Sequence, residues 1–229
     1  MKAMILAAGR GERLRPLTDI TPKPLIDVGG VPLIGHHLRA LARAGFAEVV
    51  INVAWLADRI VDALGDGADW GLSIRYSYET PGELDTGGGV RRALALLGDA
   101  PFVLISADVY SDFDYAGLPV LAPDIDMHTV LVVNPPHHPA GDFALAGGRD
   151  GGVLTLGPPC LTYGGIGVYR PSLFKGEESA RFALVSVMRR AISAGRATGQ
   201  RHAGVWVDVG RASALDHARA LAGQAGFSA

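Results

Sequence analysis

A glycine-rich stretch close to the N-terminus carries the residues best suited to binding phosphate groups. Residues 6–17 have the sequence LAAGRGERLRPL, and TPKPL follows at 21–25. Gly9 and Gly11 come directly after a short apolar run, so backbone N–H groups of the turn can converge on phosphate oxygens without obstruction from side chains. The same stretch supplies cationic side chains at Arg10, Arg13, Arg15 and Lys23. This density of positive charge suits a triphosphate that must lose pyrophosphate better than it suits a dinucleotide.

The spacing of this stretch excludes two other phosphate-binding loops. A P-loop requires Gly-Lys-Ser or Gly-Lys-Thr at the end of the turn, where this chain has Glu12, Arg13 and Leu14. The dinucleotide fingerprint requires a third glycine at position 14. Ordinary turn residues remain the alternative interpretation of the glycines, and plain surface charge that of Arg10 and Arg15.

Two aspartates, Asp108 and Asp208, each follow an apolar segment that we expect to form a strand. They are 100 positions apart, so only the fold can bring them together. Mg²⁺ prefers oxygen ligands and is often held by one or two carboxylates together with phosphates and waters. The pair therefore predicts a magnesium site, with turn or helix capping as the alternative for either residue alone.

Short apolar runs alternate with helix-period segments along the first half of the chain, and this alternation predicts how those residues are positioned. We expect crossover units and a mostly parallel sheet with helices on both faces, which binds ligands at the carboxyl ends of its strands. The expected strands are 3–6, 49–53, 72–78, 102–105, 129–134, 166–169 and 204–207. The expected helices are 33–44, 56–64, 89–97, 182–194 and 212–221, with Gly45 as a left-handed helix end.

Composition excludes several classes of protein. The 229 residues are 48% hydrophobic and 19% charged, with a net charge of −2, so a large core can form and a globally basic nucleic-acid-binding surface is absent. Cys160 is the single cysteine, which excludes an internal disulfide and a cysteine-rich metal site. No run approaches the length of a membrane span, and the N-terminus lacks the cleavage pattern of a signal peptide. We expect a cytoplasmic protein without nucleic-acid or membrane partners and with a single domain over 1–229.

The N-terminal stretch resembles the signature of the sugar-1-phosphate nucleotidyltransferases, Leu-Ala-x-Gly-x-Gly-x-Arg-Leu followed by Pro-Lys-Pro. The resemblance continues through GADWGL at 67–72, LDTGG at 84–88, Asp108, and WVDVG at 206–210. It implies a three-layer, Rossmann-like α/β nucleotidyltransferase fold with a mostly parallel mixed sheet. It also implies a nucleotide-binding part over about 1–110 and a sugar-binding part over about 111–229.

The resemblance further implies roles for individual residues. Arg13 and Lys23 would be catalytic, holding the triphosphate and the sugar phosphate, while Asp108 and Asp208 would bind Mg²⁺. The implied nucleotide-binding residues are Leu6, Ala8, Gly9, Gly11, Glu12, Arg13, Lys23, Glu79, Leu84 and Gly88. The implied sugar-binding residues are Asp142, Tyr163 and Gly164, with capping of its own turn as the alternative for Asp142.

The loop NPPHHPAGDF at 134–143 resembles that of the N-acetylmuramate-1-phosphate uridylyltransferases of peptidoglycan recycling. This implies UTP and N-acetylmuramate 1-phosphate as substrates. Glu79 can accept a hydrogen bond from the imide N–H of uracil, but it can equally accept the N–H pair of guanine. A mannose- or heptose-1-phosphate guanylyltransferase therefore remains the alternative within the family.

One departure from the family pattern concerns the sugar side. Many relatives carry a Glu-Lys-Pro stretch whose lysine touches the sugar phosphate, whereas residues 157–160 here read GPPC. Either another cation, Lys175 or Arg201, is expected to substitute for that lysine, or Mg²⁺ takes a larger part in binding the sugar phosphate. The adjacent His137 and His138 are expected to belong to a rigid sugar-contacting loop rather than to a metal site.

Two readings from other classes are less consistent with the sequence. A non-catalytic nucleotide sensor would be expected to lack one of Arg13, Lys23, Asp108 or Asp208, all of which are present. Leu14 and the cationic loop disfavour an NAD-dependent dehydrogenase. The sequence shows no appended repeat domain of the kind that assembles larger relatives, so a monomer is expected.

Overall fold

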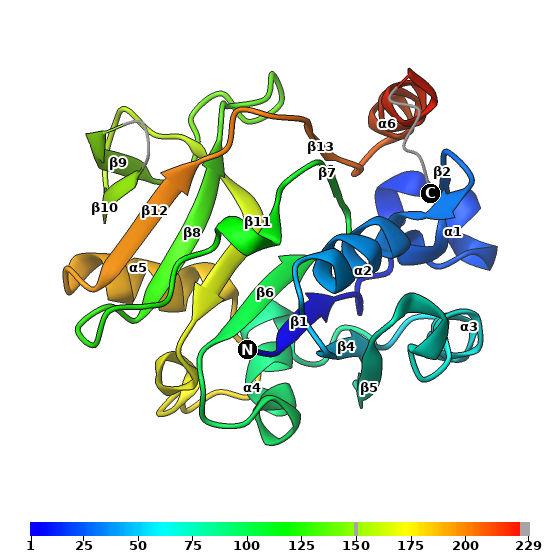
Figure 1. The fold of residues 1–229 in the computed structure, drawn as a ribbon, viewed down its shortest axis with the longest axis horizontal. Coiled ribbons are helices and arrows are strands. Elements are labelled where there is room, and N and C mark those ends of the chain that lie inside the picture. Colours follow the sequence, from blue (N-terminus) through cyan, green and yellow to red (C-terminus); the bar gives the residue numbers. More distant parts are fainter. Residues whose placement is uncertain (149–150, 225–229) are drawn as a thin grey trace.

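The computed structural model describes residues 1–148 and 151–224. A nine-stranded sheet crosses the molecule in the order β5-β4-β1-β6-β11-β8-β12-β10-β9 (Figure 1). Along the chain its strands are β1 Ala3–Leu6, β4 Glu48–Val53, β5 Ser73–Tyr78, β6 Phe102–Ser106, β8 Met127–Val132, β9 Ala144–Gly148, β10 Gly151–Thr155, β11 Thr162–Tyr169 and β12 Ala197–Arg201. Both halves of the sequence thus contribute to one sheet.

The first half of the chain forms the parallel part of this sheet, in which β5, β4, β1 and β6 are neighbours. Short runs of Val, Ile and Leu are typical of parallel strands because both faces of such a sheet are covered. The crossover helices are α2 Leu33–Arg43, α3 Ala57–Leu64 and α4 Asp85–Leu97. Gly45, with φ of 82°, follows α2, as expected for a left-handed helix end.

The second half of the chain forms a mixed sheet. Strand β11 is antiparallel to both β6 and β8, while β12 is parallel to β8, and the hairpin β9–β10 completes the far edge. The expected strand at 204–207 does not join this sheet. Instead, β13 Trp206–Asp208 pairs antiparallel with β7 Val109–Ser111 in a separate two-stranded ladder.

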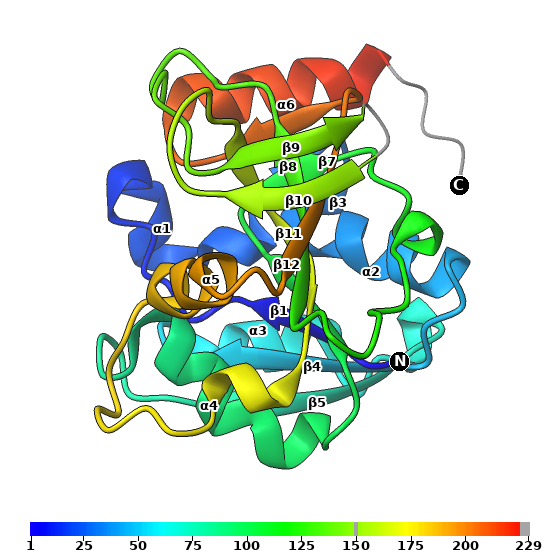
Figure 2. The ribbon, with the colours of Figure 1, turned by 90° about the vertical axis from the view of Figure 1, so that its left-hand side faces the viewer.

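Helices cover both faces of the large sheet, so the expected three-layer α/β architecture is confirmed (Figure 2). Alternate residues of β1 point to opposite faces: Ile5 packs in the cluster that contains α2 and α3 side chains, and Met4 in the cluster that contains those of α4 and α5 Leu184–Ser193. A third cluster lies beneath α6 Ala212–Gln224 and includes Val28 of β2 Asp27–Val28, the strand that pairs with β3 Val31–Pro32. The remaining short helix is α1 Leu17–Ile20.

Several expected boundaries differ from the structure. Helix α4 begins at Asp85 rather than at residue 89, and the strands β7, β9, β10 and β12 were not anticipated. The alternating sequence of 72–78 puts Tyr78 on the same face as Leu72 and Ile74, yet Tyr78 is 53% exposed, while Ser77 is buried. Strand β5 lies at the edge of the sheet and Tyr78 is its last residue, so the simple alternation fails at that end.

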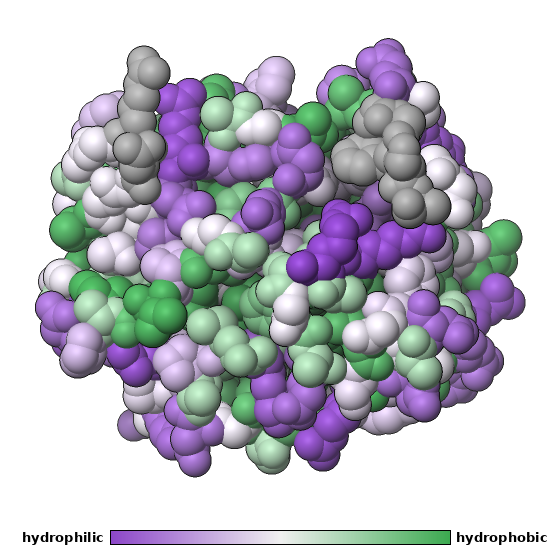
Figure 3. All heavy atoms as spheres, viewed as in Figure 1, coloured by the Kyte–Doolittle hydropathy of each residue, from purple (hydrophilic) through white to green (hydrophobic). Residues whose placement is uncertain are grey.

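Hydrophobic and hydrophilic residues are interspersed on the face of the molecule in Figure 3. None of the helices within the described ranges is long and apolar enough to cross a membrane.

Candidate active site

A cleft of about 530 Å³ opens at the carboxyl ends of β1, β4 and β6. This is the edge at which a parallel sheet presents the residues that follow its strands. The lining residues already proposed from the sequence are Leu6, Ala8, Gly9, Gly11, Glu12, Arg13, Lys23, Glu79, Leu84 and Asp108. The proposed nucleotide-binding residues therefore surround one cavity, with Gly88 as the exception.

The glycine loop turns sharply directly after β1. Gly11 has φ of 71°, and a Cβ there would lie 3.0 Å from Cγ2 of Thr18 and 3.2 Å from Cβ of Lys23. Its carbonyl oxygen accepts hydrogen bonds from the backbone N–H of Leu14 and from the hydroxyl of Thr18. Both the backbone angle and the close neighbours require glycine at this position. The loop is thereby held against the segment that carries Lys23.

Lys23 reaches from that segment into the cleft. It belongs to a short 3-10 turn, Lys23–Leu25, in which Pro22 precedes and Pro24 follows the lysine. Its ammonium lies 2.7 Å from Oδ2 of Asp108, and the residue is only 8% exposed. A largely buried lysine is stabilised by such a pair, and removing either partner would leave an uncompensated charge.

The ladder formed by β7 and β13 brings Asp108 and Asp208 together. Asp208 is paired with Val109, and the backbone N–H of Val209 donates to the carbonyl oxygen of Asp108 at 2.9 Å. Arg13 lies beside Gly210, where a Cβ would be 2.8 Å from Nη2 of Arg13 and 3.2 Å from Oδ1 of Asp208. Two carboxylates and two cationic side chains from four separate segments thus lie near one end of the cleft, whose lining includes Arg13, Lys23 and Asp108 but not Asp208.

These two carboxylates suit Mg²⁺ but not a metal held by protein ligands alone. Within residues 1–148 and 151–224 no three His, Cys, Asp or Glu side chains lie close enough to form a metal site. Mg²⁺ commonly binds to one or two carboxylates and takes its other ligands from substrate phosphates and water. The donor set of Asp108 and Asp208 beside a phosphate-binding loop fits that pattern.

Asn52 is a residue of the cleft that the sequence reasoning missed. It is buried at the end of β4, where its Oδ1 accepts the backbone N–H of Ala7 and its Nδ2 donates to Oε1 of Glu79, both at 2.8 Å. Burial raises the pKa of Glu79, and the bond from Asn52 partly opposes that shift. The available signal was an amide within the apolar run 49–53, since buried polar groups usually have a structural partner.

Gly88 does not offer its amide to the cleft. Its N–H donates to the carbonyl oxygen of Phe182 at 3.1 Å, and a Cβ on Gly88 would overlap the carbonyl oxygen of Ala180. Gly87 and Gly88 thus let α4 approach the segment before α5, whereas a Cβ on Gly89 would lie 2.6 Å from Oε1 of Glu79.

The proposed sugar-side residues lie outside the lining of the cleft. Asp142 accepts the backbone N–H of Tyr163 at 2.8 Å on one carboxylate oxygen and Nε2 of His138 at 3.1 Å on the other. The Tyr163 hydroxyl points into the core, where it accepts a hydrogen bond from the hydroxyl of Tyr169. The carbonyl oxygen of Gly164 accepts the indole N–H of Trp206. Asp142 thus ties its loop to the backbone of β11 and to the His138 side chain, and neither bond is a cap on the backbone of its own turn.

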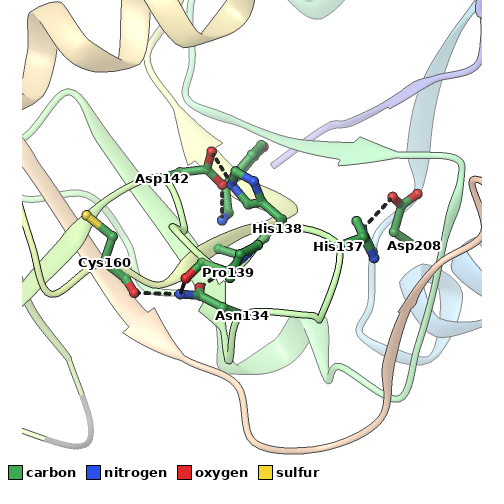
Figure 4. A network of polar contacts seen from close by, with 9 residues as sticks. Asn134, His137, His138, Pro139, Asp142, Cys160 and Asp208 are labelled. Atoms are coloured by element: carbon green, nitrogen blue, oxygen red, sulfur yellow. Dashed lines mark hydrogen bonds and ion pairs between the residues drawn. The ribbon is translucent and has the colours of Figure 1, made fainter.

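The loop at 134–142 approaches the two aspartates from the second half of the chain. Nε2 of His137 lies 3.6 Å from Oδ2 of Asp208 (Figure 4). Lys175, one of the two expected substitutes for the missing lysine, instead pairs with Asp99 just beyond the C-terminal end of α4. Its ammonium is therefore remote from the cleft at the opposite edge of the sheet.

Comparison with known proteins places these features in a family. A nucleotidyl transferase family model matches residues 2–151. The chain is 50% identical over 228 residues to the N-acetylmuramate alpha-1-phosphate uridylyltransferase of Neisseria meningitidis serogroup B, covering 97% of this chain and 99% of that protein. The protein of the same name from Caulobacter vibrioides is 33% identical over 224 residues, or 91% of each chain.

Two further similarities bear on function and fold. The mannose-1-phosphate guanyltransferase of Kluyveromyces lactis is 39% identical over 121 residues, which cover 52% of this chain and 33% of that protein. A Bacillus anthracis crystal structure described as a glucose-1-phosphate thymidylyltransferase in complex with sucrose has a TM-score of 0.84. It is 23% identical and covers 100% of this chain and 98% of its own, so it demonstrates a shared fold.

Proposed function

The chain belongs to the nucleotidyl transferase family, and we propose that it transfers the uridylyl group of UTP to N-acetylmuramate 1-phosphate, giving UDP-N-acetylmuramate and pyrophosphate. The observation that carries this proposal is the 50% identity with the Neisseria enzyme, which extends through the half of the chain proposed to bind the sugar. The glycine loop and Asp108, which line one cleft, and Asp208, which lies next to Asp108 in the β7–β13 ladder, would supply the chemistry.

In the proposed reaction, a phosphate oxygen of the sugar 1-phosphate attacks the α-phosphorus of UTP. A new P–O bond forms there, the bond from the α-phosphorus to the oxygen bridging to the β-phosphorus breaks, and pyrophosphate leaves with that oxygen. The nucleophile is already an anion, so no general base is needed. Catalysis then consists of aligning two polyanions and neutralising their repulsion.

Arg13, Lys23 and the amides of the glycine loop are the groups that would neutralise this charge. Lys23 is preorganised by its 2.7 Å contact with Asp108 and needs little rearrangement to meet a phosphate oxygen. Asp108 and Asp208 would hold Mg²⁺, which when bound supplies positive charge to the reacting phosphates.

Nucleotide recognition is assigned to the first part of the chain, about 1–110, and sugar recognition to about 111–229, within one domain over 1–229. The nucleotide would contact Leu6, Ala8, Gly9, Gly11, Glu12 and Leu84, and Glu79 would accept the imide N–H of uracil. Asn52 fixes the orientation of that carboxylate. The turn held by Asp142 would place the backbone of Tyr163 and Gly164 beside the sugar.

A mannose-1-phosphate guanylyltransferase is the second candidate, favoured by the 39% identity over 121 residues to the Kluyveromyces enzyme. That similarity covers only 52% of this chain, whereas the similarity to the Neisseria protein covers 97%.

UTP and a nucleotide sugar of peptidoglycan recycling would place the reaction in the cytoplasm.

Pyrophosphate release tests the proposal directly. Purified enzyme with Mg²⁺ is offered UTP, GTP or dTTP, each with N-acetylmuramate 1-phosphate, mannose 1-phosphate or glucose 1-phosphate. We expect release with UTP and N-acetylmuramate 1-phosphate to have the highest kcat/KM. Consumption of GTP alone would refute the uridylyl assignment.

Two variants with matched controls test the assigned roles. Asp108→Asn and Lys23→Met are each expected to lower kcat by at least about a hundredfold, because each removes a preorganised charge contact. The exposed Asp216→Asn on α6 and Lys175→Met beside Asp99 remove the same charges away from the cleft and should leave kcat unchanged. Near-normal turnover in either cleft variant would contradict its role.

A further inference from the structure

We infer that His137 donates a hydrogen bond to the phosphate of the sugar 1-phosphate and replaces the lysine missing from residues 157–160. The inference rests on the proposed function and names a substrate-binding residue for it. It follows from where the imidazole lies, how its loop is held, and how the other cations of the second half are engaged.

The His137 imidazole lies beside Asp208, near the end of the cleft that Asp108 lines. Its Nε2 is 3.6 Å from Oδ2 of Asp208, and the side chain is 31% exposed (Figure 4). That separation is longer than a hydrogen bond, so Nε2 lies close to the carboxylate but is not hydrogen-bonded to it. An imidazole carries an N–H in every protonation state, and a neighbouring carboxylate favours that N–H on the facing nitrogen.

The loop that carries His137 is fixed on both sides of it. Asn134 donates through Nδ2 to the carbonyl oxygens of Pro139 and Cys160, and its Oδ1 accepts the hydroxyl of Thr162, all within 3.0 Å. Gly141 closes the loop with φ of 65°, where a Cβ would lie 2.8 Å from Oδ1 of Asn134. The ring position of His137 therefore follows from a bonded loop rather than from an unrestrained tip.

His138, the next residue, is committed elsewhere. Its Nε2 lies 3.1 Å from Asp142, whose second oxygen accepts the N–H of Tyr163. The two adjacent histidines thus have different tasks: His138 anchors the loop to β11, and His137 faces Asp208.

Four of the cationic side chains in the second half are engaged at other places. The occupied groups are Lys175 with Asp99, Arg170 with the carbonyl oxygens of Leu121, Ala122 and Ile125, Arg190 with Glu177 and the carbonyl oxygen of Leu173, and Arg196 with Asp126. Arg201, the other substitute expected from the sequence, lies exposed at the end of β12, and Arg211 lies exposed three residues after Asp208; these two arginines are the rival candidates.

Lys23 and Arg13 approach the two aspartates from the nucleotide side, and His137 approaches from the opposite half of the chain. A sugar phosphate that enters from that half would place an anionic oxygen near Asp208. A donor on the same side offsets that repulsion and orients the oxygen.

The test compares His137→Leu, which removes the donor, with His137→Gln, whose amide nitrogen retains one. His137→Leu is expected to raise KM for N-acetylmuramate 1-phosphate about tenfold or more and to leave KM for UTP within about twofold. His137→Gln should recover most of that loss. His217→Leu, an exposed histidine of α6, is the matched control and should behave as wild type.

Calorimetric binding of N-acetylmuramate 1-phosphate alone gives a second readout, in which the same tenfold weakening is expected. Equal rises in both KM values, no rise in His137→Leu, or a selective rise confined to Arg201→Gln would each overturn the inference. Failure of the proposed function is distinguishable, since the wild-type enzyme would then release no pyrophosphate from this substrate pair.

Discussion

Asn52 gives the sharpest test of how the cleft is assembled, because one buried amide joins three segments. Its Oδ1 accepts the N–H of Ala7 in the loop after β1, and its Nδ2 holds Glu79 after β5, both at 2.8 Å. The change Asn52→Leu keeps the side-chain shape and removes both bonds. It leaves a buried N–H at Ala7 and a half-buried carboxylate at Glu79 without their partner.

The expected cost follows from these two bonds. A buried backbone N–H left without a partner costs about 1–3 kcal/mol, and loss of a bond to a carboxylate that can regain water adds about 1 kcal/mol. A total of about 3 kcal/mol lowers the Tm of a chain of this size by about 6–12 °C. Because Ala7 and Glu79 both line the cleft, KM for the nucleotide should also rise about tenfold.

Thermal unfolding by circular dichroism and steady-state kinetics measure the two effects. Thr129→Val on β8 is the control, since it also removes a buried polar group, but one whose hydroxyl has no hydrogen-bond partner among the described residues. That variant should be as stable as the wild type or more so. If Asn52→Leu unfolds within about 1 °C of the wild type, or keeps its KM for the nucleotide, the amide does not organise the cleft.

Two further predictions concern the packing around the site. Burial lowers the pKa of His37 from its ordinary 6.5 to about 4, so the unfolded chain gains a proton there before the native one does. Protonation of His37 in the unfolded chain should therefore lower the free energy of unfolding by about 2 kcal/mol between pH 7 and pH 5. In urea denaturation, the drop in unfolding free energy over this pH range should be smaller by about 2 kcal/mol in His37→Asn than in the wild type. Gly88→Ala places a Cβ against the carbonyl oxygen of Ala180, so it should push α4 away from the segment before α5 and lower Tm by several degrees. Gly9→Ala is the control, because a Cβ on Gly9 meets no atom within 4 Å, and it should leave Tm unchanged. Equal Tm values for the two variants would contradict this packing argument.

The sequence was sufficient for the parallel half of the sheet because its signals are local. A short apolar run, a glycine turn and a helix-period stripe each occupy a few consecutive residues, as in β1 and α2. The hairpin β9–β10 and strand β12 were missed because AGG, GGV and ATGQR contain few β-branched or aromatic residues. Their strand conformation depends on pairing with neighbours rather than on intrinsic preference.

Residues of the candidate site could be proposed from the sequence where they belong to a local motif, but not where their contacts depend on the register in which two strands pair. The backbones of Asp108 and Asp208 are neighbours through the β7–β13 ladder instead of the large sheet, and their joint binding of Mg²⁺ stays a prediction. The contact of Asn52 with Glu79 requires β4 and β5 to pair in one register, which no local pattern encodes. The hydrogen bond from the Gly88 N–H to the Phe182 carbonyl oxygen likewise depends on how α4 packs against a segment about ninety residues later in the chain.

The separate β7–β13 ladder has a consequence for the order in which the molecule is completed. All nine strands of the large sheet have been synthesised once Arg201 leaves the ribosome, whereas the second carboxylate of the acidic pair arrives only with β13. A nascent chain that stops between residues 201 and 206 would contain all nine strands of the large sheet and the glycine loop, but not Asp208. Strand β13, which is made after every strand of the large sheet and before α6, would then add the second proposed Mg²⁺ ligand to an already assembled framework.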